Sequence, residues 1–314
     1  MSTSKTRAFL ICIAAYVAAA AVALGLARIV RGLHPLWVAA VADAAATIAI
    51  FLFSMAFDNS SLYDPYWSVA PPVIALYWLL AGSAGVVTLR VVPLFALVLI
   101  WSVRLTSNWA RGWQGMEHED WRYVDFRKRF GRLYWPVSFL GIHFFPTVVV
   151  FLGCLSLYAV LGGPGRSLGV LDALAVVVTG TAVWIEATAD RQLRRFFAAR
   201  SGETGGPAEE TGRAPEERPV FASGLWSLSR HPNYFGEVLF WWGLYLFALA
   251  AAPRLWWAVI GPLTVTALFV FVSVPMMDRR MLARRPGYAE TMRSRSALVP
   301  WFPRRRELEE EAPS

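Results

Sequence analysis

Residues 138–161 read SFLGIHFFPTVVVFLGCLSLYAVL, 24 positions without an Asp, Glu, Lys or Arg. A helix rises 1.5 Å per residue, so about 20 apolar residues cross the roughly 30 Å hydrocarbon core of a bilayer. A helix also satisfies its own backbone N–H and C=O groups, which lipid cannot do. The stretch therefore predicts a membrane-spanning helix and an all-α fold.

Outward from this stretch, seven more segments satisfy the same criterion. They are residues 8–27, 36–57, 69–89, 91–107, 168–188, 234–252 and 255–275. A short polar break around Arg90 separates two of them. The sequence thus predicts a polytopic integral membrane bundle of seven or eight transmembrane helices.

Composition supports the same class. Hydrophobic residues make up 56% of the 314 positions and charged residues only 17%, against about 25% in an ordinary soluble domain. The 15 Trp and 20 Phe exclude a disordered chain. Two cysteines, Cys12 and Cys154, exclude a disulfide scaffold.

The charged segments fall on one side of the predicted bundle. With eight spans, 25 of the 30 Lys and Arg residues lie in the N-terminal tail and in residues 104–136, 189–233 and 276–314. The positive-inside rule then places both termini in the cytoplasm and opens any active site there to the cytoplasm. This bias accounts for the net charge of +8 without a nucleic acid partner.

The sequence predicts a single transmembrane domain over residues 1–303. Residues 201–219 (SGETGGPAEETGRAPEERP) indicate a flexible cytoplasmic insertion, and residues 304–314 a disordered charged tail. Lys5, Arg7 and the small residues at 21–23 leave a cleaved signal peptide as an alternative for the first span, whose length favours an anchor.

Polar residues at membrane depth are costly, so each needs a reason. Glu186, Asp190 and Arg194 follow one another at intervals of four and share one helix face. One interpretation is a salt-bridged helix exit. The other is a polar wall facing a ligand that enters from the cytoplasm.

The densest polar cluster is GLWSLSRHPNYFGE at residues 224–237, which opens the seventh span. Arg230 and His231 stand just before the helix N-terminus, whose free amides attract anions. Asn233 and Glu237 lie four apart on one face, with Tyr234 beside them. The cluster predicts a ligand with a phosphate and an amide or ring, although an ordinary amphipathic helix start is the alternative.

Other groups are less specific. Arg104, Asn108 and Arg111 recur at helical spacing and suit phosphates or lipid headgroups. Residues 117–120 (EHED) precede a basic run and predict a salt-bridged helix instead of a metal site. With no HExxH, no CxxC and four His, the sequence gives a zinc site little support.

At these residues the chain resembles a known group. GLW and SRHPNYFGE are similar to the C-terminal signature of the steroid 5-alpha-reductase superfamily, and most similar to its bacterial DUF1295 branch. The stretches that also fit are DPYWSVAPP at 64–72, EDWRY at 119–123, IEATADRQL at 185–193 and SALVPW at 296–301. Isoprenylcysteine and phospholipid methyltransferases and sterol reductases carry strings similar to RHPxYxG.

The resemblance implies a membrane enzyme that takes NADPH from the cytoplasm, in a bacterial inner membrane. It implies that Asn233 and Glu237 hold the nicotinamide end, that Asp190 and Glu186 face the adenosine or ribose, and that Arg295 helps to bind the cofactor. Tyr288 or Asp278 fills the role of the polar residues before Arg295. The residues 201–219 and the segment RRPGYAET are departures from the pattern.

The resemblance is weaker at the catalytic residues. Steroid reductases orient the substrate ketone with a Glu and a Tyr on the N-terminal helices, and Trp101 stands about where that Tyr is expected. Asp64 and Tyr66 are chemically able to take these roles, with Tyr66 as the proton donor.

The sequence therefore predicts an NADPH-dependent oxidoreductase that transfers hydride to the activated C=C of a lipophilic enone, steroid-like or lipid-like. The first alternative is a membrane methyltransferase that uses S-adenosylmethionine. The second is a lipid-binding or scaffold membrane protein without enzymatic activity. The expected partners are a lipophilic small molecule and membrane lipids.

Overall fold

The computed structural model describes residues 3–82, 89–163, 165–204, 220–285 and 287–303. Its helices, in chain order, are α1 (Thr3–Ile29), α2 (Pro35–Ala56), η1 (Ser60–Leu62), α3 (Tyr66–Ala81), α4 (Val91–Gly112), α5 (Trp121–Phe130), η2 (Gly131–Leu133), α6 (Tyr134–Ser138), η3 (Phe139–Phe144), α7 (Phe145–Leu161), α8 (Val170–Thr204), α9 (Leu225–Leu228), α10 (Pro232–Ala251), η5 (Pro253–Val259), α11 (Ile260–Leu268), η6 (Phe269–Ser273), α12 (Val274–Arg284) and α13 (Tyr288–Ser294). Within the described residues there is no strand beyond one isolated bridge between Ser229 and Ser296. The predicted all-α class is confirmed.

Seven helical stretches of the described chain are long and apolar enough to cross a membrane. They are Ser4–Ile29, Pro35–Ala56, Val91–Gly112, Trp121–Leu161, Val170–Ala199, Pro232–Ala251 and Pro253–Arg284. The remaining predicted span, at residues 69–89, corresponds to α3. This helix has 16 residues and falls short of the length needed to cross a membrane. Large apolar side chains cover the outside of the helices, and Leu80 and Phe271 are each 76% exposed. Lipid is the solvent that accommodates them, so the chain is an integral membrane protein.

Two helices extend beyond the membrane spans predicted for them. The span predicted at 168–188 continues as α8 to Thr204, and the span predicted at 255–275 continues to Arg284 at the end of α12. A helix does not stop where the lipid stops, because charged residues such as Arg194 are good helix formers in water. The predicted insertion lies outside the described residues from 205 to 219, as does the tail 304–314.

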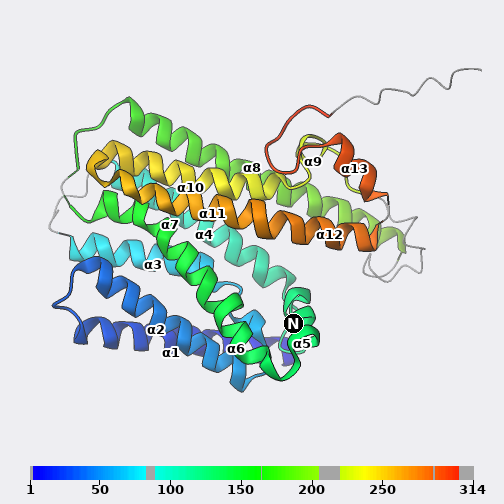
Figure 1. Ribbon diagram of the computed structural model, residues 1–314, viewed down its shortest axis with the longest axis horizontal. Helices are drawn as coiled ribbons and strands as arrows, with labels where there is room; N and C mark the ends of the chain where they lie inside the picture. The colour runs from blue at the N-terminus through cyan, green and yellow to red at the C-terminus, as the bar shows by residue number, and fades with distance from the viewer. Residues whose placement is uncertain (1–2, 83–88, 164, 205–219, 286, 304–314) are drawn as a thin grey trace, which may run out of the picture. The chain divides into compact units, whose positions relative to one another are not determined.

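The chain divides into two compact units. The first holds Met1–Val176 and Leu244–Thr264, and the second holds Val177–Gly243 and Val265–Ser314. In the first unit α1 and α2 lie side by side (Figure 1), and small residues such as Ala15, Ala19 and Ala46 let them approach closely. Arg90, at the start of α4, is buried and pairs with Asp172 through a 2.5 Å contact.

In the second unit α8 and α10 lie side by side (Figure 1), and glycines of α10 meet α8. A Cβ added to Gly236 would overlap the Glu186 side chain and lie 3.0 Å from the carbonyl oxygen of Ala182. A Cβ added to Gly243, seven residues on, would overlap the side chain of Thr179. Such small residues let helix backbones approach where no hydrophobic effect drives them together.

Candidate functional site

The second unit joins two of the motifs found in the sequence. The backbone N–H of Arg230 donates to the carbonyl of Ser296 (2.9 Å), and that of Trp301 donates to the carbonyl of Leu228 (3.0 Å). The Ser229 hydroxyl donates to the carbonyl of Leu298 (2.8 Å). The stretches SRHPNYFGE and SALVPW therefore run alongside each other and form the entry to α10.

Asp278 on α12 is the centre of this entry. Its Oδ1 accepts from His231 Nε2 (2.9 Å) and from the Tyr288 hydroxyl (2.7 Å), and its Oδ2 accepts from Arg230 Nη2 (2.8 Å). All of these side chains are nearly buried; those of Arg230 and Asp278 are 9% and 8% exposed. A buried carboxylate needs such donors to offset its lost hydration. The group is called here the Asp278 cluster: Arg230, His231, Asp278 and Tyr288.

Arg230 is bonded within the protein on all three nitrogens. Nε and Nη2 donate to Asp278, while Nη1 donates to the carbonyls of Met292 (3.2 Å) and Arg295 (2.8 Å). The guanidinium thus ties α12, α13 and the following segment to the start of α10. The sequence predicted that the Arg230 side chain binds a phosphate. In the structure it donates to Asp278.

Asp278 also orients His231. A carboxylate only accepts hydrogen bonds, so Nε2 of His231 carries a proton and donates it to Asp278. The imidazole stacks on Tyr234 with the ring centroids 5.2 Å apart and an interplanar angle of 11°. Tyr234 in turn contacts Phe269. The predicted site residues His231 and Tyr234 therefore form one stack at the first turn of α10.

The first turns of α10 place Asn233 and Glu237 on one face. Glu237 is 3% exposed, and its Oε1 accepts from Trp241 Nε1 one turn further (2.9 Å). Asn233 is half-buried, and its amide has no hydrogen bond to the residues that the structure describes. Glu186 of α8 is 2% exposed and lies against Gly236, between these two positions along α10. Two acidic side chains and one amide of the predicted set thus meet at the contact between α8 and α10.

The loop before α10 is anchored to α8 further along. Leu225 N–H donates to Gln192 Oε1 (3.0 Å), and Trp226 Nε1 donates to the carbonyl of Ala189 (3.1 Å). Gly224 begins this loop at φ +62°, a left-handed conformation that favours glycine. On the same stretch of α8, Asp190 is half-buried and Arg194 is exposed.

Arg295 and Tyr288 are the last predicted residues of the second-unit site along the chain. Arg295 Nη1 donates to the carbonyl of Trp226 (3.1 Å), and burial lowers the pKa of its guanidinium, although Tyr288 opposes that shift. Burial, reinforced by the hydrogen bond to Asp278, raises the pKa of Tyr288. The phenol therefore stays protonated and remains a donor to the carboxylate.

The predicted catalytic pair, Asp64 and Tyr66, lies in the first unit but its members have different partners. Tyr66 donates to Asp43 Oδ1 on α2 (2.7 Å). Asp64 accepts from the Tyr123 hydroxyl and lies 3.8 Å from Arg122 Nη2. Burial raises the pKa of Asp64 to about 6, while Arg122 opposes the shift. The acid beside Tyr66 is therefore Asp43, which the sequence marks only as a lone carboxylate within a span.

Arg104, Asn108 and Arg111 also belong to the first unit, near the end of α4. Arg104 and Asn108 are half-buried and Arg111 is exposed. They follow one another at helical spacing, as predicted. Their proposed contact with phosphates stays a prediction.

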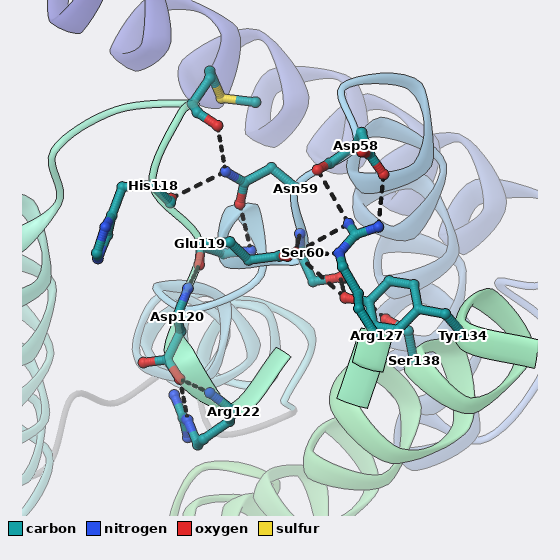
Figure 2. A network of polar contacts seen from close by, with 12 residues as sticks. Asp58, Asn59, Ser60, His118, Glu119, Asp120, Arg122, Arg127, Tyr134 and Ser138 are labelled. Carbon is teal, nitrogen blue, oxygen red and sulfur yellow. Dashed lines mark hydrogen bonds and ion pairs between the residues drawn. The ribbon is translucent and has the colours of Figure 1, made fainter. Parts of the chain in front are cut away.

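A second polar network in the first unit was only partly foreseen (Figure 2). Asn59 is 1% exposed, and its Nδ2 donates to the carbonyls of Met116 (2.8 Å) and His118 (3.1 Å). Glu119 accepts from the Ser60 N–H (2.7 Å) and from Arg127 Nε (2.6 Å). The predicted ion pairing of the 117–120 segment is therefore present. The helix predicted there begins later, at Trp121, because Asp120 caps it and accepts from Arg122 N–H.

A family model described as "Protein of unknown function (DUF1295)" matches residues 50–294. The chain belongs to the DUF1295 family. This family lies within the steroid 5-alpha-reductase-like superfamily, which confirms the resemblance of the motifs. An uncharacterised protein of Schizosaccharomyces pombe is 30% identical over 220 residues. No solved structure matches the chain.

The DUF1295 match takes in the whole Asp278 cluster and the α8 and α10 residues. Arg295 and the SALVPW stretch lie just beyond it, although the structure binds them to the same entry. The alignment with the yeast protein covers 67% of this chain and 64% of the relative, so the chain spans a little under two thirds of that relative's length. Because this relative belongs to a yeast, family membership does not by itself assign the chain to a bacterial membrane.

Proposed function

We propose that this DUF1295 protein is a membrane-embedded, NADPH-dependent reductase that acts on the activated C=C of a lipophilic enone. The observation that carries the proposal is the α8–α10 contact, where Glu186, Asn233 and Glu237 gather around Gly236. Membership of the steroid 5-alpha-reductase-like superfamily supports it. In this proposal the protein lies in a membrane that borders the cytoplasm, and the site is open to the cytoplasm.

The side chains at this contact fit the nicotinamide end of the cofactor. A carboxamide presents two donor hydrogens and one acceptor oxygen, and the Asn233 amide presents the same set. The Asn233 amide forms no hydrogen bond with the residues that the structure describes. The Glu237 carboxylate, by contrast, accepts a hydrogen bond from Trp241 Nε1. Asn233 would bind and orient the ligand, and Glu237 would accept from one of its N–H groups.

The Asp278 cluster has a supporting role in this proposal. Arg230 donates to Asp278 and to the carbonyls of Met292 and Arg295, and His231 donates to Asp278, so both residues hold the first turn of α10 in place. Arg194 and Arg295 are then the second-unit cations proposed for the phosphates. Asp190 would accept from a ribose hydroxyl.

The cofactor would supply the hydride, and the chain would supply a proton donor for the oxygen that gains negative charge. The Tyr66 phenol donates to Asp43 Oδ1 (2.7 Å) and belongs to the first unit, so this second-unit site assigns it no proton transfer. Asp64 is assigned no proton transfer, because it accepts from Tyr123.

Ligand binding to the purified full chain in detergent tests the proposal. NADPH, NADH and S-adenosylmethionine are each added, and the unfolding temperature is measured. A ligand at 100 times its Kd stabilises the folded state by about 2.7 kcal/mol. Stabilisation by NADPH alone is the expected result. Stabilisation by S-adenosylmethionine alone would assign the chain to the methyltransferases, and no stabilisation by any of the three would refute both enzymatic functions.

A further inference from the structure

The segment that joins α4 to the long apolar helix of the first unit is strongly basic. Helix α5 (Trp121–Phe130) is capped by Asp120, whose Oδ1 accepts from Arg122 N–H at 2.9 Å. It ends at Gly131, which has φ +48°. Residues 127–132 read RKRFGR, and the apolar stretch that follows continues to Leu161. A basic helix therefore lies directly before a membrane span.

Two of its arginines are bound inside the protein. Arg127 Nε donates to Glu119 Oε2 (2.6 Å), and its Nη1 donates to Asp58 Oδ1 (2.8 Å). Its guanidinium also lies over the Tyr134 ring at 4.1 Å. Arg122 is bonded to Asp120 (2.7 Å). Figure 2 shows these bonds of Arg122 and Arg127, which engage both side chains within the protein.

The remaining cations face outward. Lys128, Arg129 and Arg132 are all exposed. None of them forms an ion pair with a carboxylate in the part of the chain that the structure describes. Asp125 is exposed on the same helix, so the outward face keeps an excess of positive charge.

Apolar exposure begins immediately after these cations. Leu133 is 64% exposed and Leu140 is 62% exposed. Side chains of this kind are placed in hydrocarbon and not in water. A hydrocarbon boundary next to Arg132 would place the three cations at the level of the lipid phosphates.

We propose that Lys128, Arg129 and Arg132 form a binding site for the headgroup phosphate of an anionic phospholipid. The arginines present planar donor groups that suit phosphate oxygens, and the lysine adds a point charge. Arg127 is bonded to Glu119 and Asp58, so it is not one of these outward cations. This site is independent of the proposed reductase function.

Lipid titration of the purified full chain tests the site. Phosphatidylglycerol and phosphatidylcholine with identical acyl chains are compared by native mass spectrometry. The test variant is K128Q/R129Q/R132Q, and the matched control is R28Q/R31Q/R254Q, which removes three exposed arginines elsewhere in the first unit. Each cation near an anionic headgroup contributes about fivefold in affinity. The wild type and the control are expected to prefer phosphatidylglycerol by roughly tenfold or more, and the test variant is expected to lose that preference.

Three results would overturn the site. One is an unchanged preference in K128Q/R129Q/R132Q, which would make the face merely solvated. Another is an equal loss in the control, which would show a diffuse effect of charge. The third is displacement of the lipid by an equal concentration of inorganic phosphate, which would assign the cations to a soluble anion. Equal unfolding temperatures of the variants, expected for surface substitutions, establish that all are folded.

Discussion

Arg230 and Asp278 form a buried ion pair, with Nη2 and Oδ2 2.8 Å apart and both side chains less than a tenth exposed. The pair joins α12 to the residue that precedes His231 and α10. The sequence separates its members by 48 positions. Through this pair, the residues Arg230 and His231 of the motif RHPNY bind Asp278 in the folded chain.

Asp278→Ala should destabilise the second unit strongly. The substitution leaves the buried Arg230 and His231 without their carboxylate, and such a loss costs about 3–5 kcal/mol. The loss is measured as a lower unfolding temperature in detergent. Because the cluster holds the first turn of α10, NADPH affinity should fall as well, measured where the variant is still folded.

The chain offers a matched control for Asp278→Ala. Asp172 forms a buried pair with Arg90 in the first unit. Asp172→Ala should lower the unfolding temperature to a similar degree and leave NADPH affinity unchanged. If both variants lose affinity equally, the Asp278 cluster has no special role in positioning α10.

Gly236→Ala should destabilise the α8–α10 contact. The added Cβ would overlap Glu186 and lie 3.0 Å from the Ala182 carbonyl oxygen, and overpacking of this kind costs about 1–3 kcal/mol. Gly25→Ala is the control, because a Cβ at Gly25 on α1 meets nothing within 4 Å. That variant should be more stable by about 0.5–1 kcal/mol. Equal unfolding temperatures for the two variants would contradict the close helix contact.

Asp64 should make stability depend on pH. Burial raises its pKa to about 6 in the folded chain, whereas an unfolded Asp ionises near about 3.9. Between these values the folded state binds more protons than the unfolded state, so the free energy of unfolding falls as the pH rises from about 4 to 6. Above that window the contribution is constant.

Asp64→Asn removes the ionisable group and isolates this effect. The free energy of unfolding of the wild type, minus that of the variant, should decrease as the pH rises through the same window. Denaturant titrations at several pH values measure the difference. Parallel pH curves for the two proteins would show that Asp64 does not titrate there.

Asn233→Ala should weaken NADPH binding by roughly threefold to tenfold, the value of one lost hydrogen bond. Glu237→Gln should weaken it too, while keeping the acceptor for Trp241 Nε1 and hence the local packing. The exposed amide of Gln114 provides the control Gln114→Ala. Kd values from fluorescence titration decide the matter, and unchanged values for both α10 variants would remove the proposed site.

Much of the site could be foreseen because its residues fall in short motifs. Asn233, Tyr234 and Glu237 lie within one helical turn of each other, and helix geometry alone places Asn233 and Glu237 on one face. The partners of Arg230 and Tyr66 could not be foreseen in this way. Asp43 is an isolated acid in an apolar span, and Asp278 is followed directly by Arg279 and Arg280, so no local pattern names the partner of either acid.

The sequence by itself determined that this chain is an all-helical membrane protein of the DUF1295 family. Hydropathy is a sum over neighbouring residues, and a motif is read along the chain, so neither needs a folded structure. Only the tertiary structure decided which charged residues form ion pairs with each other. A buried ion pair forms where helix packing brings two groups within about 3 Å, as it does for Arg230 and Asp278, and separation along the chain does not set that distance.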